Sequence, residues 1–170
     1  RDGLLVLQRP VPPGSNIAFA GTDIGQGEIV LRRGDQLTSR ENGVLAALGV
    51  SEIAVVRRPR VAILSTGNEL IPPGAPMKPG FTHDSNSTVL ADAVRELGCE
   101  PVPLGIIPDD QALLLDTLRR ALVHDAILLS GGTSKGAGDV SYRAVADLGR
   151  PGIVAHGIAL KPGKPLCCLL

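Results

Sequence analysis

The 170-residue chain has no formal net charge, because 17 basic side chains balance 17 acidic ones, and 44% of its residues are hydrophobic. Aromatic residues make up only 2%, and no Trp is present. Because stacking platforms and basic blocks are both scarce, we expect no nucleic-acid partner. The longest apolar runs are too short to span a bilayer, so we expect no membrane partner either. These properties predict an ordinary globular domain, or one domain plus a fragment, with a substantial core.

The cysteines and the ends of the chain give two further expectations. Cys99, Cys167 and Cys168 are odd in number and lack the spacing of metal ligands. We therefore expect reduced thiols and a cytoplasmic location. The chain begins at Arg1 rather than Met, and it ends in a strand-like apolar run. We expect the polypeptide to continue at both ends.

Residues 1–58 are predicted to form a small, partial accessory region. Its beginning is rich in Pro and Gly, as in a linker. A short helix is predicted over Ser39–Leu48. Thr38 or Ser39 is its expected N-cap, and Gly49 is its expected stop. Two short apolar runs bounded by polar residues predict strands, at Ile29–Leu31 and Ile53–Val56.

Residues 59–170 alternate regularly between strand and helix patterns. The apolar runs that predict strands are Val61–Leu64, Val102–Ile107, Ala126–Leu129 and Ile153–Leu160. Apolar residues recur at helical spacing around Val89–Leu97, Gln111–Val123 and Tyr142–Leu148. This alternation predicts an α/β domain with a mostly parallel sheet and helices on both faces.

Polar clusters follow the predicted strands at four places. They are residues 65–69, 109–110, 130–139 and 161–165. Because parallel strands point their carboxyl ends the same way, we expect these clusters to meet at one rim of the sheet. Open α/β sheets bind their ligands at that rim.

The segment Leu128–Asp139 reads L-L-S-G-G-T-S-K-G-A-G-D and carries the most distinctive chemistry. Glycines let the backbone come close to a ligand, and successive N–H groups can cradle an anion. Lys135 is a candidate phosphate contact, and Asp139 is a candidate cation ligand. A flexible surface loop is the alternative for this segment taken alone.

The predicted rim is rich in carboxylates and lysines, which suit phosphates handled together with Mg²⁺. The acids are Glu69, Asp84, Asp109, Asp110 and Asp139, and the lysines are Lys135, Lys161 and Lys164. Metal ions and lysines clamped on phosphoryl oxygens are common in phosphoanhydride chemistry. The residues alone therefore predict a phosphorylated or nucleotide-like ligand and a divalent cation.

These residues also have simpler interpretations. Three carboxylates can serve as helix N-caps: Asp84 together with Ser85, Asp109, and Asp139. Glu69 can be a solvated loop acid, and Lys161 and Lys164 can be surface charges. Among the histidines only His83 falls near the predicted rim, and packing is its simpler role. The sequence contains no P-loop and no dinucleotide-binding fingerprint.

Five segments resemble, in order, the motifs of one family. They are Ser65–Leu70 (S-T-G-N-E-L), His83–Asn86 (H-D-S-N), Gly105–Asp110 (G-I-I-P-D-D), Ser130–Gly136 (S-G-G-T-S-K-G) with Asp139, and Lys161–Pro165 (K-P-G-K-P). Together they resemble the molybdopterin molybdotransferase (MoeA, gephyrin E-domain) family over about residues 14–170. The ordered set is specific, although each motif alone is weak. Gly21–Ile24 also resembles a stretch that precedes the catalytic domain of that family.

The resemblance implies a three-layer α/β/α domain of the MogA/MoaB type and a role in molybdenum cofactor biosynthesis. In the implied reaction adenylated molybdopterin is hydrolysed, molybdate is the second substrate, and AMP is released. Mg²⁺ or another divalent cation takes part. Members of the family are homodimers, and another domain of the partner chain completes each site. We expect this chain alone to be inactive, because it lacks most of the family's second domain and all of its last.

The resemblance also implies roles for individual residues. Glu69, Asp109 and Asp139 match the essential acids of the family and are the expected catalytic residues. Glu69 and Asp139 are the expected metal ligands. The expected substrate-binding residues are Thr66, Gly67, Asp84, Ser85, Asn86, Gly131, Gly132, Ser134, Lys135, Lys161 and Lys164.

The chain departs from the family pattern at several positions. Asn68 replaces the usual Asp of S-T-G-D-E, and Ser87 stands where an Arg is frequent. Val140 follows Asp139 where an aromatic residue is usual, and Ala18-Phe19-Ala20 replaces an arginine-rich stretch. Fewer positive charges should weaken the binding of a polyanionic ligand.

Two alternative functions follow from these departures and from the domain organisation. The segment G-G-T-S-K-G-A-G-D resembles a divergent branch in which the domain is fused to a solute-binding-like domain. A non-catalytic module that senses molybdopterin or molybdate within a larger fused protein is therefore the alternative to an enzyme. An adenylyltransferase of the MogA type is a third possibility, against which the accessory region at residues 22–58 argues.

Overall fold

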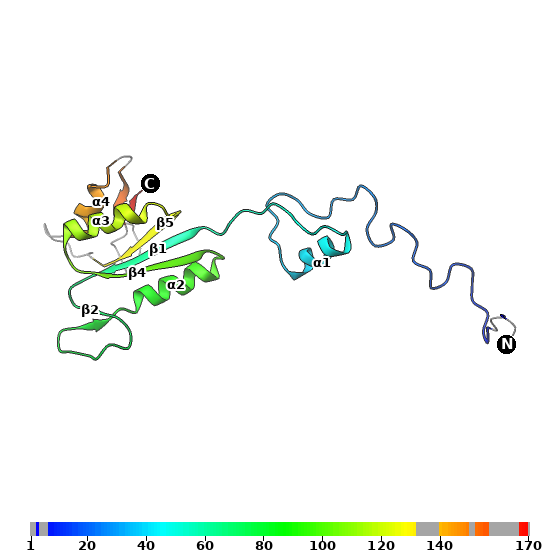
Figure 1. The fold of residues 1–170 in the computed structure, drawn as a ribbon, viewed down its shortest axis with the longest axis horizontal. Coiled ribbons are helices and arrows are strands. Elements are labelled where there is room, and N and C mark those ends of the chain that lie inside the picture. Colours follow the sequence, from blue (N-terminus) through cyan, green and yellow to red (C-terminus); the bar gives the residue numbers. More distant parts are fainter. Residues whose placement is uncertain (1–2, 4–6, 132–139, 150–151, 157–166, 170) are drawn as a thin grey trace. The chain divides into compact units, whose positions relative to one another are not determined.

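The computed structural model describes residues 3, 7–131, 140–149, 152–156 and 167–169. The chain divides into two compact units, Arg1–Val55 and Val56–Leu170. Among the described residues, only the second unit contains strands (Figure 1). None of the described helices has the length and apolar character needed to cross a bilayer.

The first unit contains one described helix, α1 (Ser39–Ala47). Thr38 and Glu41 form a capping box at its start. Gly49 follows its end with a φ of 75°, a left-handed conformation that favours glycine. The predicted helix, its N-cap at Thr38 and its stop at Gly49 are therefore confirmed.

The two strands predicted on either side of α1 are wrong. The described chain is not in a strand at residues 29–31 or 53–56. Ile29 is 67% exposed and Val56 is 94% exposed, so these apolar runs are not buried. β-branched residues favour a strand only where a neighbouring strand and a buried face are available.

The second unit is built on a parallel three-stranded sheet (Figure 1). Its strands lie in the order β4 (Glu100–Ile107), β1 (Arg60–Thr66) and β5 (Ala126–Ser130). The central strand β1 is buried from Val61 to Thr66, which explains why its apolar run shows no alternation. The three predicted strands and their parallel pairing are confirmed.

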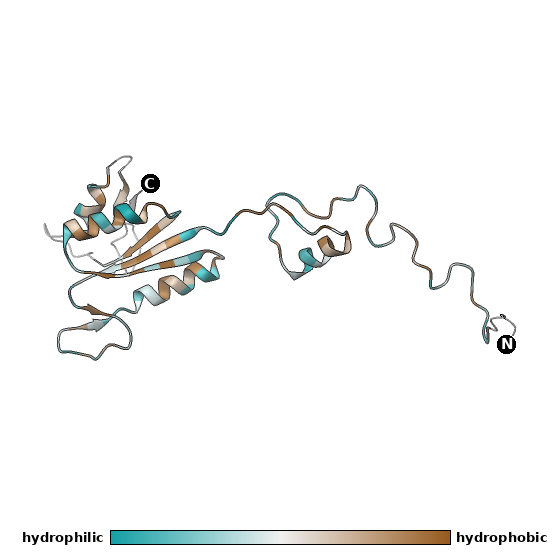
Figure 2. Ribbon diagram, in the orientation of Figure 1, coloured by the Kyte–Doolittle hydropathy of each residue, from teal (hydrophilic) through white to brown (hydrophobic). Residues whose placement is uncertain are grey.

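Helices cover both faces of this sheet. α2 (Asn86–Glu96) packs on one face, and α3 (Gln111–Ala121) and α4 (Val140–Ala146) pack on the other. Successive residues of β1 point to opposite faces and so divide between two core clusters. The first cluster contains Val61, Ile63, Ala91 and Val94, and the second contains Leu64, Leu114, Leu118 and Ala144. Figure 2 shows apolar colouring along β1 and mixed colouring on α2 and α3. The predicted three-layer α/β/α fold is confirmed.

Two short pairs of strands lie outside the main sheet. β2 (Leu70–Ile71) pairs in parallel with β3 (Thr82–His83), a pair that the sequence did not predict. His83 Nε2 lies 2.9 Å from the carbonyl oxygen of Ala75. The ring therefore contacts its own loop, in line with a structural role for His83. β6 (Ile153–His156) pairs antiparallel with β7 (Cys167–Leu169). The predicted strand at Ile153–Leu160 is confirmed over Ile153–His156, in a separate sheet from β1, and residues 157–160 lie outside the described residues.

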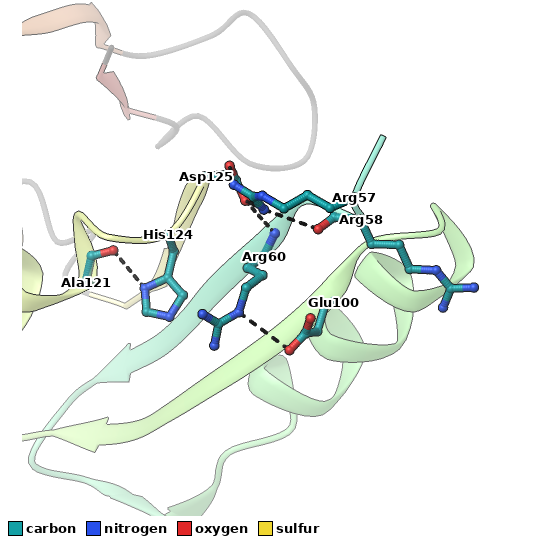
Figure 3. Close-up of polar contacts among 7 residues, drawn as sticks. All are labelled: Arg57, Arg58, Arg60, Glu100, Ala121, His124 and Asp125. Carbon is teal, nitrogen blue, oxygen red and sulfur yellow. Dashed lines mark hydrogen bonds and ion pairs between the residues drawn. The ribbon is translucent and has the colours of Figure 1, made fainter. Parts of the chain in front are cut away.

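A polar network ties the segment before β1 to the neighbouring strands (Figure 3). Two guanidinium nitrogens of Arg57 each lie 2.6 Å from a carboxylate oxygen of Asp125, and the Arg60 N–H donates to the same carboxylate at 2.7 Å. These donors lower the pKa of Asp125 to about 2. Arg60 also pairs with Glu100 at 3.5 Å. The network fixes the amino end of β1 between β4 and β5.

Candidate functional site

The three parallel strands end side by side. Thr66 lies opposite Ile107, and Ser65 lies opposite Ser130. The polar clusters that follow β1, β4 and β5 therefore begin at one edge of the sheet, as predicted. We call this edge, formed by residues 65–69, 107–109 and 130–131, the carboxyl rim. The fourth predicted cluster, residues 161–165, lies outside the described residues.

Asp109 is held at the carboxyl rim by the loop that follows β1. The Thr66 hydroxyl donates to Asp109 Oδ1 at 3.0 Å, and the Asn68 N–H donates to Oδ2 at 3.4 Å. In return, the Asp109 N–H donates to Asn68 Oδ1 at 3.2 Å. Each carboxylate oxygen thus accepts one hydrogen bond, although Asp109 is exposed. Asp109 therefore presents a fixed acceptor at the rim.

The neighbouring acid, Asp110, is the N-cap of α3. Its side chain accepts a hydrogen bond from the N–H of Leu113 at 2.9 Å. The simpler interpretation of Asp109 as a helix cap is therefore wrong, because Asp110 has that role. Two adjacent acids before one helix have different functions, and only their hydrogen bonds distinguish them.

The Glu69 carboxylate folds back over Gly67. Gly67 has a φ of 153°, and a Cβ at this position would lie 2.8 Å from Glu69 Oε2. The missing side chain therefore leaves room for the carboxylate. The Gly67 N–H donates to the Ile107 carbonyl at 3.3 Å, so this N–H serves the sheet edge. Glu69 is exposed, as a group that meets a ligand must be.

Asp84 is a buried acid, only 3% exposed, at the start of α2. Its Oδ1 accepts from the Ser87 N–H at 3.1 Å, which makes it a cap of that helix. Burial alone would raise the pKa of Asp84, but interactions with the Ser65 hydroxyl and with Ser87 and Asn86 outweigh burial and lower it. The geometry thus gives Asp84 a supporting position behind the carboxyl rim.

The residues at the start of α2 connect this helix to β5. Asn86 Nδ2 donates to Ser130 Oγ at 2.9 Å. Ser85 is exposed, and its side chain makes no capping hydrogen bond. Ser130 was not among the predicted site residues. The available signal was a polar residue that closes an apolar strand directly before glycine.

Gly131 packs against the main chain at the end of β1. It has a φ of 110°, and a Cβ there would lie 2.2 Å from the carbonyl oxygen of Thr66. Only glycine fits such a contact, since a Cβ would overlap a backbone atom. Gly131 therefore brings β5 close to β1 at the point where the predicted anion cradle begins.

Six predicted site residues lie outside the described residues: Gly132, Ser134, Lys135, Asp139, Lys161 and Lys164. In the part of the chain that the structure describes, no three His, Cys, Asp or Glu side chains gather as metal ligands. Glu69 supplies one carboxylate near the rim, and its predicted co-ligand Asp139 is not among the described residues. The metal site therefore stays a prediction.

Comparisons with known proteins identify the family. Residues 62–169 match the family described as "Probable molybdopterin binding domain", and residues 2–49 match "MoeA N-terminal region (domain I and II)". The first match covers more than half of the chain and includes the three-stranded sheet except for the first two residues of β1. The chain belongs to the molybdopterin binding domain family.

Individual relatives agree with this assignment. The chain is 34% identical over 165 residues to molybdopterin molybdenumtransferase of Haemophilus influenzae, covering 96% of this chain and 40% of that protein. It is 37% identical over 172 residues to molybdopterin molybdenumtransferase 2 of Mycobacterium tuberculosis, covering 95% and 41%. A crystal structure of the molybdopterin biosynthesis MoeA protein of Pyrococcus horikoshii matches with a TM-score of 0.78 and 36% identity, covering 94% and 39%. The chain spans about 40% of the length of these relatives.

Proposed function

We propose that this chain is the molybdopterin-binding part of an enzyme that inserts molybdate into adenylated molybdopterin and releases AMP. One observation carries the proposal: Thr66 and Asn68 fix the exposed Asp109 carboxylate at the carboxyl rim, where Glu69 is also exposed. Fixed polar groups at the carboxyl ends of parallel strands suit ligand binding and electrostatic catalysis. The family match and the names of the relatives support the choice of ligand.

The proposal assigns a role to each acid. Asp109, with both oxygens engaged, orients the ligand as a fixed acceptor. Glu69 and Asp139 bind Mg²⁺ or another divalent cation, whose charge offsets that of the phosphoryl oxygens. The other residues proposed to contact the substrate are Ser85, Asn86, Gly131, Gly132, Ser134, Lys135, Lys161 and Lys164. Thr66 and Gly67, which are buried, are proposed to bind the substrate indirectly, by holding Asp109 and the edge of the sheet in place. Asp84, which is buried, is proposed to act on the substrate only through the loop that it caps.

We also propose that the chain is part of a longer polypeptide, and that this polypeptide is a cytoplasmic homodimer. The coverage of about 40% of the relatives supports the longer polypeptide. Exposed apolar side chains of the first unit support burial against a second copy: Ile17, Phe19, Ile29, Leu48, Val50 and Ile53. Light scattering on the full-length protein tests the dimer, and a monomer at working concentrations would contradict it.

The central test is AMP release from adenylated molybdopterin by the full-length protein, with and without molybdate. We expect molybdate-dependent turnover that Asp109→Asn lowers by about 100-fold or more. Asp139→Asn should abolish AMP release without unfolding the protein, and removing divalent cations should stop it. Asp116→Asn, which changes an exposed acid in an ion pair on α3, is the matched control and should leave the rate unchanged. A normal rate in Asp109→Asn would contradict the assignment.

The alternative is a sensing module that binds molybdopterin or molybdate without turnover. Loss of positive charge relative to the family pattern, as at Ser87, favours this alternative. The same assay separates the two functions. Binding of molybdopterin that survives removal of divalent cations, with no AMP released, would support the sensor and exclude the enzyme.

A further inference from the structure

Asn68 and Asp109 exchange two hydrogen bonds across the carboxyl rim. The Asp109 N–H donates to Asn68 Oδ1 at 3.2 Å, and the Asn68 N–H donates to Asp109 Oδ2 at 3.4 Å. The two residues are 41 positions apart in the chain. Each side chain therefore binds the main chain of the other, and the loop after β1 is locked to the loop after β4.

Donor and acceptor are fixed in the hydrogen bond between the Asp109 main chain and the Asn68 side chain. Because the main-chain N–H of Asp109 is a donor, the atom of Asn68 that faces it must be the carboxamide oxygen. The other oxygen of the Asp109 carboxylate accepts from Thr66, which is 2% exposed and fixed within β1. Two hydrogen bonds thus hold the exposed carboxylate, and a third, accepted by the Asn68 side chain, holds the main chain of Asp109.

The contact with the Asp109 N–H requires only an acceptor oxygen at position 68. The carboxylate of the Asp that is usual at this position in the family pattern would accept the same N–H. Asn68 is exposed, so its remaining N–H donors can meet a ligand that approaches the rim.

We propose that Asn68 is the positioning residue for Asp109. The proposal rests on the geometry of the Asn68–Asp109 pair, and its kinetic test rests on the proposed function as well.

The positioning role is tested by hydrogen–deuterium exchange of the peptide that contains Asp109, in the full-length protein. In Asn68→Ala the Asp109 amide loses its acceptor, so we expect its exchange to be about fivefold faster or more. Asn68→Asp keeps an acceptor oxygen and should keep the protection. Asn42→Ala and Asn42→Asp, on α1, are the matched controls and should match the wild type. Unchanged exchange in Asn68→Ala would overturn the positioning role.

The positioning role is also tested by the kinetics of AMP release from adenylated molybdopterin. We expect Asn68→Ala to lower kcat by about tenfold with little change in KM, because the loop that carries Asp109 loses the acceptor of its N–H. Asn68→Asp keeps an acceptor oxygen and should keep kcat within about twofold of the wild type. A normal kcat in Asn68→Ala would overturn the positioning role. If the wild type itself releases no AMP, the proposed function fails, whereas amide exchange still decides whether Asn68 positions Asp109.

Discussion

Among the described glycines, Gly131 has the closest contact, since a Cβ there would lie 2.2 Å from the carbonyl oxygen of Thr66. We expect Gly131→Ala to lower the free energy of unfolding by about 2–5 kcal/mol, because left-handed strain adds to overpacking. Urea unfolding measures this change. Gly74→Ala is the control, with a φ of 85° but nothing within 4 Å. Gly74→Ala should lower the free energy of unfolding by only about 1–2 kcal/mol, from strain. Equal losses at both positions would show that the contact between residue 131 and Thr66 contributes nothing.

Asp84 makes stability depend on pH in a defined direction. Its pKa in the folded chain lies below the ordinary 3.8, so the carboxylate contributes its full stability above that value. The contribution is lost as the pH falls through the lower, folded value. We expect Asp84→Asn to cost about 1.5–3 kcal/mol near neutral pH. The difference from the wild type should shrink in acid, as measured by urea unfolding across a pH series.

The control for Asp84 lies on the same helix. Asp92 is exposed and pairs with Arg95 one turn away, so Asp92→Asn should change stability by less than about 0.5 kcal/mol. A cost for Asp84→Asn that stays constant from neutral to acidic pH would show that the charge of Asp84 contributes nothing.

At the residue scale, the sequence predicted which residues gather but not how each one is used. The S-T-G-N-E and I-P-D-D segments placed Thr66 and Asp109 at one rim, and the structure brings them to 3.0 Å. It was open whether Asp109 caps α3, because Asp110 beside it is equally suited to that role. Such a choice depends on a hydrogen bond between residues far apart in the chain, and no local pattern contains it.

At the element scale, the ion pair between Arg57 and Asp125 anchors the segment that leads into β1 (Figure 3). We expect Asp125→Asn to speed tryptic cleavage after Arg57, because its guanidinium becomes free to enter the protease. Mass spectrometry identifies the cut. Asp92→Asn, which breaks a distant exposed ion pair, should leave that cleavage rate unchanged.

The same ion pair predicts an acid transition. The pKa of Asp125 is lowered from 3.8 to about 2, so the pair is complete above the higher value and is lost as the pH falls through the lower one. Cleavage at Arg57 by an acid-tolerant protease, or exchange of the Arg60 amide, should rise in that interval. Exchange that is insensitive to acid, or to Asp125→Asn, would contradict the anchoring role.

The sequence predicted the strands of the buried main sheet well. It predicted poorly the short strands, whose existence depends on whether a partner strand lies beside them. β1, β4 and β5 are apolar runs between helices of clear periodicity, and the alternation alone indicates parallel crossovers. The predicted strand at 29–31 failed because no partner strand is available to it among the described residues. β2 and β3 were missed because two-residue strands leave almost no sequence signal, and β6 pairs with a segment that follows it.

At the scale of the whole molecule, the described polar side chains that project from the carboxyl rim meet solvent. Asn68, Glu69 and Asp109 are all exposed, and exposed charges act weakly because water and salt screen them. Catalysis at such a rim requires a cover that excludes water and completes the set of charges. The relatives are about two and a half times as long as the part that this chain matches, so the additional polypeptide is our proposed source of that cover.

Without that cover, the 170-residue chain should bind molybdopterin but release no AMP. AMP release per mole should be at least about 100-fold slower than in the full-length protein, because the charges at the rim stay hydrated. Chromatographic detection of AMP measures the rate, and circular dichroism with a molybdopterin binding isotherm shows that the shorter chain is folded. Equal turnover by both proteins would mean that the rim of this chain is a complete active site. A folded chain that neither binds nor turns over would mean that the remaining domains contribute to ligand binding itself, and not only to excluding water from a site that is already formed.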